Sequence, residues 1–120
     1  MTRYLLCLVL PLLIVVSGCW QVDVGRSYYS NGNLRTEATV HNGMLDGPSA
    51  MYYETGEKMS EALYKAGMLD GKASSFYENG AKKAVAEYKE GVLHGNSVTW
   101  TVSGQQQSSA VFINGVLQPN

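Results

Sequence analysis

The chain has 120 residues, of which 45% are apolar, and its 9 basic and 10 acidic side chains give a formal net charge of −1. The basic residues are dispersed, and Lys82-Lys83 is the only adjacent pair. Nucleic acids and anionic lipid surfaces are bound by clustered Lys and Arg. The composition therefore argues against nucleic acid as a partner, and the length allows one domain.

The first 18 residues have the pattern of an export signal. Arg3 supplies a positive start, residues 4–16 are almost wholly apolar, and small residues precede Cys19. A membrane-spanning helix needs about 20 apolar residues, so this run is too short to span. We therefore exclude residues 1–18 from the fold and treat residues 19–26 as a short lead-in.

The sequence Val16-Ser17-Gly18-Cys19 resembles the lipobox of bacterial lipoproteins. The resemblance implies cleavage before Cys19 and attachment of acyl chains such as palmitate to that residue. Two or more chains would anchor the protein stably, because each buried methylene contributes about 0.8 kcal/mol. Trp20, in place of Asp, resembles Gram-negative lipoproteins sorted to the outer membrane, facing the periplasm. The alternative is an ordinary secretory signal with an unmodified Cys19.

Comparing the chain with itself at an offset of 24 residues gives four copies, at residues 27–50, 51–74, 75–98 and 99–120. Two glycine columns are complete, and a third ends at Pro119. The columns are Gly32, Gly56, Gly80, Gly104; Gly43, Gly67, Gly91, Gly115; and Gly47, Gly71, Gly95. Such a period within one chain indicates a repeat architecture.

Turn signals divide each copy into two strands. Asn-Gly pairs at Asn31, Asn42, Asn79 and Asn114 favour tight hairpin turns, and the spacing between turns suits one strand each. No helical pattern appears. The sequence therefore predicts an all-β fold: an elongated, twisted antiparallel meander of about eight strands in stacked hairpin repeats, preceded by the signal segment.

The second strand of each copy alternates with period two. Its alanine column, and the larger residues two positions later, should share one face, while Glu37, Glu61, Lys65, Glu87 and Lys89 face solvent. The columns are Ala38, Ala62, Ala86, Ala110, then Val40, Tyr64, Tyr88, Phe112. We expect one face of the sheet to be buried and the other to face solvent, with Leu45, Leu69, Leu93 and Leu117 in the core. The Asp46-Gly47 and Asp70-Gly71 steps predict bulges or kinks.

The second copy, with Tyr52-Tyr53-Glu54-Thr55-Gly56 and Tyr64-Lys65-Ala66-Gly67-Met68-Leu69-Asp70-Gly71, resembles the bacterial variant of the MORN repeat (membrane occupation and recognition nexus). The resemblance covers roughly residues 28–117 and implies twisted sheets of stacked hairpins. Proteins of that family include interaction scaffolds, membrane-associated proteins and chains grouped as antitoxins. The last copy departs from the pattern at Thr101 and at Gln118-Pro119, as expected of a capping repeat.

No arrangement of residues indicates catalysis, a metal site or a cofactor. His41 and His94 lie beside turns, and neither has a neighbouring nucleophile or carboxylate cluster in the sequence. The glycines lie at hairpin spacing and lack the strand–loop–helix context of a phosphate loop. We therefore expect a protein that is not an enzyme, with no cofactor, no metal and no small-molecule substrate.

Two adjacent aromatic columns remain as candidates for a binding surface. Tyr28, Tyr52, Phe76 and Trp100 form the first; Tyr29, Tyr53, Tyr77 and Thr101 form the second. Neighbouring residues on a strand face opposite sides, and only the second column keeps a hydroxyl in every copy. We interpret the second column as the more exposed one and as the candidate surface for partner binding. The alternative is that its tyrosines merely cover the sheet.

These observations predict a lipid-anchored protein of the cell envelope that acts as a non-enzymatic interaction or scaffold module. Its partners would be the membrane, through the acyl chains, and another envelope protein. One alternative is a periplasmic immunity or antitoxin-type protein that occludes a toxin. Another is a binder of cell-wall or glycan polymer. Both depend on surface chemistry, which the sequence does not place.

Overall fold

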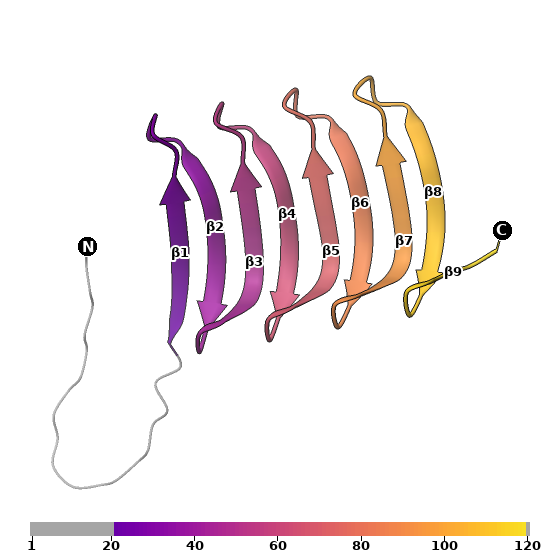
Figure 1. Ribbon diagram of the computed structural model, residues 1–120, viewed down its shortest axis with the longest axis horizontal. Helices are drawn as coiled ribbons and strands as arrows, with labels where there is room; N and C mark the ends of the chain where they lie inside the picture. Colours follow the sequence, from indigo (N-terminus) through magenta and orange to yellow (C-terminus); the bar gives the residue numbers. More distant parts are fainter. Residues whose placement is uncertain (1–20, 120) are drawn as a thin grey trace, which may run out of the picture.

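The computed structural model describes residues 21–119, and all of its regular structure is β (Figure 1). The nine strands follow one another as neighbours in a single antiparallel sheet, in the order in which they occur in the sequence. They are β1 (Val22–Tyr28), β2 (Leu34–His41), β3 (Met44–Tyr52), β4 (Lys58–Lys65), β5 (Met68–Phe76), β6 (Lys82–Lys89), β7 (Val92–Trp100), β8 (Gln106–Ile113) and β9 (Val116–Leu117). The predicted meander of stacked hairpins is confirmed, with the two-residue β9 as a ninth strand.

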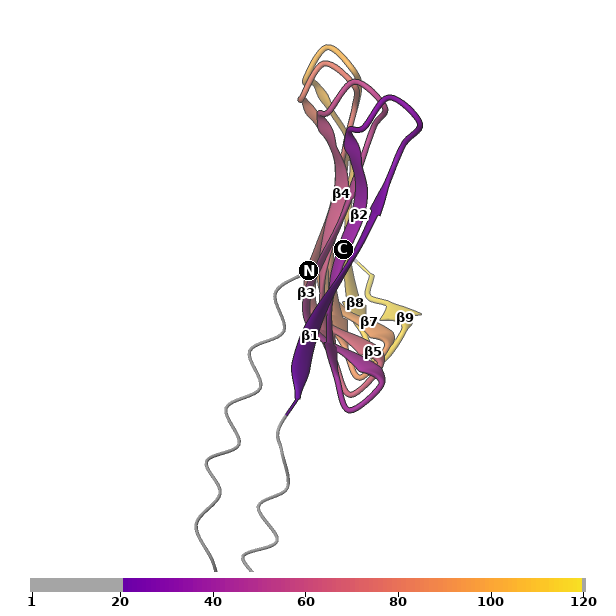
Figure 2. The ribbon, with the colours of Figure 1, turned by 90° about the vertical axis from the view of Figure 1, so that its left-hand side faces the viewer.

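The sheet is one layer thick. Its extents are 65 × 40 × 15 Å, and the view along the sheet shows curved strands with turns at both ends and no second layer (Figure 2). Among the described residues, no helix has the length and apolar character needed to cross a membrane. The predicted signal segment, residues 1–18, and Cys19 lie outside the described part of the chain.

The prediction of a buried core on one face is wrong. None of residues 21–119 is buried; Leu45, Leu69 and Leu93 are half-buried, and Leu117 is 58% exposed. Alternation places apolar residues on one face, but only a second layer can bury that face. Here the side chains shield one another only within the sheet.

The alternation itself is as predicted. Direct cross-strand partners form one row of small residues across eight strands, and we call this side the alanine face. The row is Gly25, Ala38, Ser49, Ala62, Ala73, Ala86, Ser97 and Ala110. Glu37, Glu61 and Glu87 lie on the other side, which we call the glutamate face, because alternate residues of a strand face opposite sides.

The lower turns, which join β2 to β3 and the later equivalent pairs, have two residues with positive φ. Asn42 and Gly43 have φ values of 49° and 78°, and Ala66 and Gly67 have values of 48° and 82°. Positive φ at both central positions defines the type I′ turn, which matches the twist of the flanking strands. Ala66 and Glu90 therefore occupy positions better suited to Asn, which stands at 42 and 114.

We expect Ala66→Asn to raise the free energy of unfolding by about 0.5–1 kcal/mol, because Asn tolerates the left-handed conformation better than Ala. Thermal unfolding would record this as a higher Tm. Asn42→Ala is the reciprocal variant and should lower the Tm by a similar amount. An unchanged Tm in both variants would contradict this account of the lower turns.

The upper turns, which join β1 to β2 and the later equivalent pairs (Figure 1), are longer than the tight hairpin turns that the sequence predicted. In the second copy the N–H of Gly56 donates to the carbonyl of Tyr53 at 2.9 Å, and the N–H of Tyr53 donates to the carbonyl of Glu57 at 2.8 Å. Only the glycine has positive φ, 96° at Gly56. Asn31 and Asn79 instead accept backbone N–H groups two residues later, which closes the turn through their side chains.

The predicted irregularity at the third glycine column is confirmed. The pairing of β2 with β3 shifts register between Ala38 and Val40, opposite Gly47, and equivalent shifts occur opposite Gly71 and Gly95. These glycines have φ values of 117–121°, which L-residues rarely adopt. Gly47 also lies against Thr39, where a Cβ would approach the Thr39 Cβ at 3.2 Å.

Candidate functional site

The tyrosines of the second aromatic column join consecutive repeats. The hydroxyl of Tyr29 donates to the backbone carbonyl of Tyr52 at 2.7 Å, and Tyr53 makes the same bond to Phe76 at 2.8 Å. Tyr77 completes the series with a 2.9 Å bond to the carbonyl of Trp100. Each hydroxyl therefore reaches over to the repeat that follows it.

This geometry corrects the expectation that these hydroxyls reach water or a partner. Tyr29, Tyr53 and Tyr77 are half-buried, whereas Tyr28 of the first column is 59% exposed. The second column is therefore not the more exposed one. Binding of a partner through the ring faces stays a prediction; the contact that explains the hydroxyl is internal.

Thr101, the fourth member of the column, does not bond to a carbonyl of another repeat. Its hydroxyl accepts the N–H of Gln105 at 3.1 Å and lies 2.9 Å from the hydroxyl of Ser103, all within one turn. The hydroxyl retained in the fourth copy thus closes its own turn and does not extend to another repeat. The likeness between Tyr and Thr in this column is chemical and not functional.

Other side chains strengthen the upper junctions. Asn31 and Asn33 each donate to the carbonyl of Glu54, at 3.0 and 2.8 Å. The guanidinium of Arg35 lies 5.7 Å from the centre of the Tyr29 ring, and the ammonium of Lys83 lies 5.6 Å from that of Tyr77. Cations at such distances are attracted to an aromatic face, so they hold the rings in position.

The lower turns form a second set of junctions. The N–H groups of Gly67, Gly91 and Gly115 donate to the carbonyls of Leu45, Leu69 and Leu93, at 2.7–2.8 Å. Asp70 accepts the N–H of Glu90, and the Nδ1 of His94 accepts the N–H of Asn114, both at 3.3 Å. The Asp column therefore has a structural role at the turns, as the sequence suggested.

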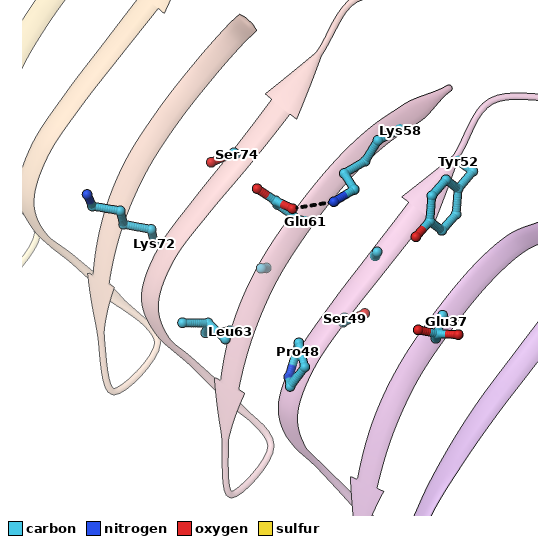
Figure 3. A pocket seen from close by; sticks show the side chains of 11 residues that line it. Glu37, Pro48, Ser49, Tyr52, Lys58, Glu61, Leu63, Lys72 and Ser74 are labelled. Carbon is cyan, nitrogen blue, oxygen red and sulfur yellow. Dashed lines mark hydrogen bonds and ion pairs between the residues drawn. The ribbon is translucent and has the colours of Figure 1, made fainter. Parts of the chain in front are cut away.

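A hollow lies over β3 and β4 on the glutamate face (Figure 3). Its volume is about 450 Å³. It is lined by Glu37, Pro48, Ser49, Ala50, Tyr52, Lys58, Glu61, Ala62, Leu63, Lys72 and Ser74. We call it the β3–β4 hollow; small residues form its floor between the Tyr52 ring and the Leu63 side chain.

The rim of this hollow carries charges of both signs. The Nζ of Lys58 lies 2.7 Å from Glu61, and this hydrogen bond raises the pKa of Lys58 above its ordinary value (Figure 3). On the neighbouring strands, Arg26 pairs with Glu37, and that hydrogen bond raises the pKa of Arg26. An apolar floor with a paired polar rim is the usual composition of a protein-binding surface.

Differences between the copies make the hollow a single site. The position of Leu63 holds Glu87 and Val111 in the next two copies, and that of Glu61 holds Val85. The ion pair at the rim is therefore confined to the first half of the sheet. Leu63 itself is 46% exposed, so one side of the hollow presents an apolar side chain to solvent.

A smaller hollow of about 290 Å³ lies on the alanine face over β4, β5 and β6. Tyr64, Leu69 and Tyr88 border it, and its floor consists of alanine and serine. The predicted pairing of small residues with an aromatic on one face is thus observed. The structure leaves this surface open.

Within residues 21–119, no three His, Cys, Asp or Glu side chains are grouped so as to hold a metal. His41 lies 3.7 Å from Asp46 through its Nδ1. Cys19, the predicted lipidation site, lies outside the described residues.

The fold and the junctions define a class: an all-β repeat protein in which each hairpin repeat binds the next through its turns. The MORN repeat variant model matches residues 24–42, 45–66 and 69–90, more than half of the chain. The chain therefore belongs to the MORN repeat variant family, and its sheet fits a repeat-based interaction module. Neither a curated protein nor a solved structure matches it.

The sequence analysis missed the β3–β4 hollow. Its residues come from four strands, and only the register brings Glu37 and Lys72 to the same face. One signal in the sequence could have indicated it. The repeat position of Leu63 is not kept, since it holds Glu87 in the third copy and Val111 in the fourth. A column that breaks the internal repeat marks a surface that the repeat itself does not require.

Proposed function

We propose that the protein is a lipid-anchored, non-enzymatic interaction module of the cell envelope, whose β3–β4 hollow receives a protein partner. Cys19 would carry the acyl chains, in an outer membrane facing the periplasm. The observation that carries the proposal is the one-layer sheet: both faces are open, and no described side chain is buried. Such a sheet is all surface, so its larger apolar side chains remain available for contact.

The composition of the hollow supports a protein partner. Tyr52 and Leu63 supply an aromatic and an aliphatic anchor, and Lys58 and Glu61 form a paired rim. Central apolar anchors surrounded by polar groups contribute most of the binding energy in protein interfaces. Because the charges of the rim are balanced, they favour orientation and specificity over attraction of one charge type.

The anchor has its own test. We expect Cys19→Ala to abolish labelling by fatty acid and to release the protein from membranes, because the modified thiol is lost. Metabolic labelling followed by membrane fractionation measures both. Cys7→Ala is the matched control and should leave labelling unchanged. Labelling that persists in Cys19→Ala would contradict lipidation at this residue.

The partner surface is tested by chemical cross-linking in intact cells that express the full chain. We expect Leu63→Lys to reduce capture of the partner by roughly tenfold or more, because the charge would be placed against the partner's apolar anchor. Val111→Lys is the matched control. It occupies the same position two copies later, on the same face, with 43% exposure against 46% for Leu63.

The possible results separate the alternatives. Equal capture by both variants would contradict the hollow as the contact, and loss only in a Tyr29/Tyr53/Tyr77→Ala variant would instead favour the tyrosine rings. A captured toxin would identify an immunity protein. Retention on insoluble cell wall without a captured protein would favour a polymer binder, with Tyr64 and Tyr88 of the smaller hollow as the residues to replace.

A further inference from the structure

The outer edge of β1 has no partner strand within residues 21–119, since β1 stands at one end of the strand order. It is seven residues long and contains no proline. Val22 and Tyr28 are 60% and 59% exposed, and Val24 is 48% exposed. The later equivalents of Tyr28, which are Tyr52, Phe76 and Trp100, are half-buried beside a preceding hairpin. Long, unblocked edges of this kind pair with further strands.

The hydrogen-bonding direction of β1 follows from the tyrosine bonds. The carbonyls of Tyr52, Phe76 and Trp100 each accept a hydroxyl from the preceding repeat, so they face toward it. Tyr28 holds the same place in the first copy, and its carbonyl therefore faces the open side of β1. Because peptide groups alternate along a strand, those of Val22, Val24 and Arg26 face this side too.

The edge at the other end of the described sheet is built differently. Val116 and Leu117 of β9 cover Ile113 and Phe112 of β8, and the N–H of Gln118 donates to the carbonyl of Val111 at 2.8 Å. The rest of that edge begins with polar residues, from Gln106 to Ser109, and Pro119 follows β9. Polar side chains and proline are the devices by which proteins prevent edge pairing. β1 has neither.

We propose that β1 pairs with β1 of a second copy, antiparallel and about a two-fold axis through Gly25, to give one continuous sheet. In this register Val24 lies opposite Arg26 of the other copy, and Val22 lies opposite Tyr28. All the outward peptide groups from Val22 to Tyr28 are then paired, and side chains keep their faces.

The charges of β1 select this register. Asp23 lies opposite Ser27, so no like charges meet. A shift of two residues in one direction puts Arg26 opposite Arg26, which is unfavourable. The opposite shift leaves Tyr28 outside the paired segment. A second copy also gives a closed assembly. Both chains use the same β1 edge in the contact, so pairing stops at the dimer.

A cysteine at position 25 tests the axis. In the proposed register the two Gly25 residues form a non-hydrogen-bonded pair with Cα atoms about 4.5 Å apart, within the range of a disulfide. A Cβ at Gly25 has ordinary contact only, 3.9 Å from the carbonyl oxygen of Ala38. We expect Gly25→Cys in the full chain to give a disulfide-linked dimer in non-reducing electrophoresis.

Asp23→Cys is the matched control. Its two copies would be displaced by four residues, about 13 Å, which is too far for a disulfide. We expect the dimer band of Gly25→Cys to exceed that of Asp23→Cys by roughly tenfold or more, with wild type as the background for Cys19. Equal bands would show random collision and overturn the proposed axis.

A proline variant tests the pairing without cysteine. Val24→Pro removes an outward N–H and leaves the bonds between β1 and β2 intact; Ser109→Pro does the same at the β8 edge. Sedimentation of the purified full chain should show a dimer for wild type and Ser109→Pro. For Val24→Pro the dimer Kd should rise by roughly tenfold or more, because each chain loses the bond that the N–H of residue 24 donates to Arg26 of the other copy. A monomeric wild type at tens of micromolar, or equal effects of the two prolines, would overturn the proposal.

Discussion

Gly71→Ala should lower the free energy of unfolding by about 2–4 kcal/mol, one of the two largest effects that the structure predicts on stability. Gly71 has a φ of 117°, outside the left-handed helical region that Ala can reach at modest cost. An added Cβ would also lie 3.2 Å from the Leu63 Cδ1 and 3.4 Å from its Cβ. Denaturant unfolding of the purified chain measures the change.

Gly67→Ala separates the two causes. Gly67 has positive φ, 82°, but no atom lies within 4 Å of the position of its Cβ. We expect this variant to lose about 1 kcal/mol, from backbone strain alone. If Gly71→Ala lost no more than Gly67→Ala, the close approach to Leu63 would have no energetic importance. The bulge at Gly71 would then follow from the strand pairing, and it would not itself help to fix the register of β4 and β5.

Much of this fold is encoded locally, and that part could be predicted. The glycine columns place the turns, and Ala38, Ala62, Ala86 and Ala110 set the face, because turn chemistry and period two depend on near neighbours. That residues 21–119 contain no buried core could not be predicted in the same way. An apolar face looks the same in a sequence whether or not a second layer covers it.

The functional side chains divide similarly. The sequence singled out Tyr29, Tyr53 and Tyr77 as a column, but it assigned their hydroxyls to water or a partner. The acceptor is a main-chain carbonyl 23 residues further on, and every residue type has that carbonyl. No side-chain pattern could therefore mark it. The exception at Thr101 was the usable clue, since a ligand-binding column has no reason to change size in the last copy.

Changing Tyr29, Tyr53 and Tyr77 together to Phe should lower the free energy of unfolding by about 2–4 kcal/mol. Each hydroxyl bond contributes about 0.5–1.5 kcal/mol, and the loss leaves a carbonyl of the next repeat without its donor. The three sites are two strand spacings apart, about 10 Å, so their effects should add. Phe keeps the ring and its stacking against Arg35 and Lys83, so the measurement isolates the hydroxyl.

Tyr52→Phe is the control, because its column already holds Phe76 and Trp100 in later copies, and it should change stability by less than about 0.5 kcal/mol. The hydroxyl bonds matter for more than the magnitude of the stability change. A one-layer sheet has no core to keep its repeats in register, so the junctions between repeats carry that task. If the triple variant proved as stable as Tyr52→Phe, the strand ladder alone would hold the repeats together. The hydroxyl column would then again require a partner outside the chain to explain it.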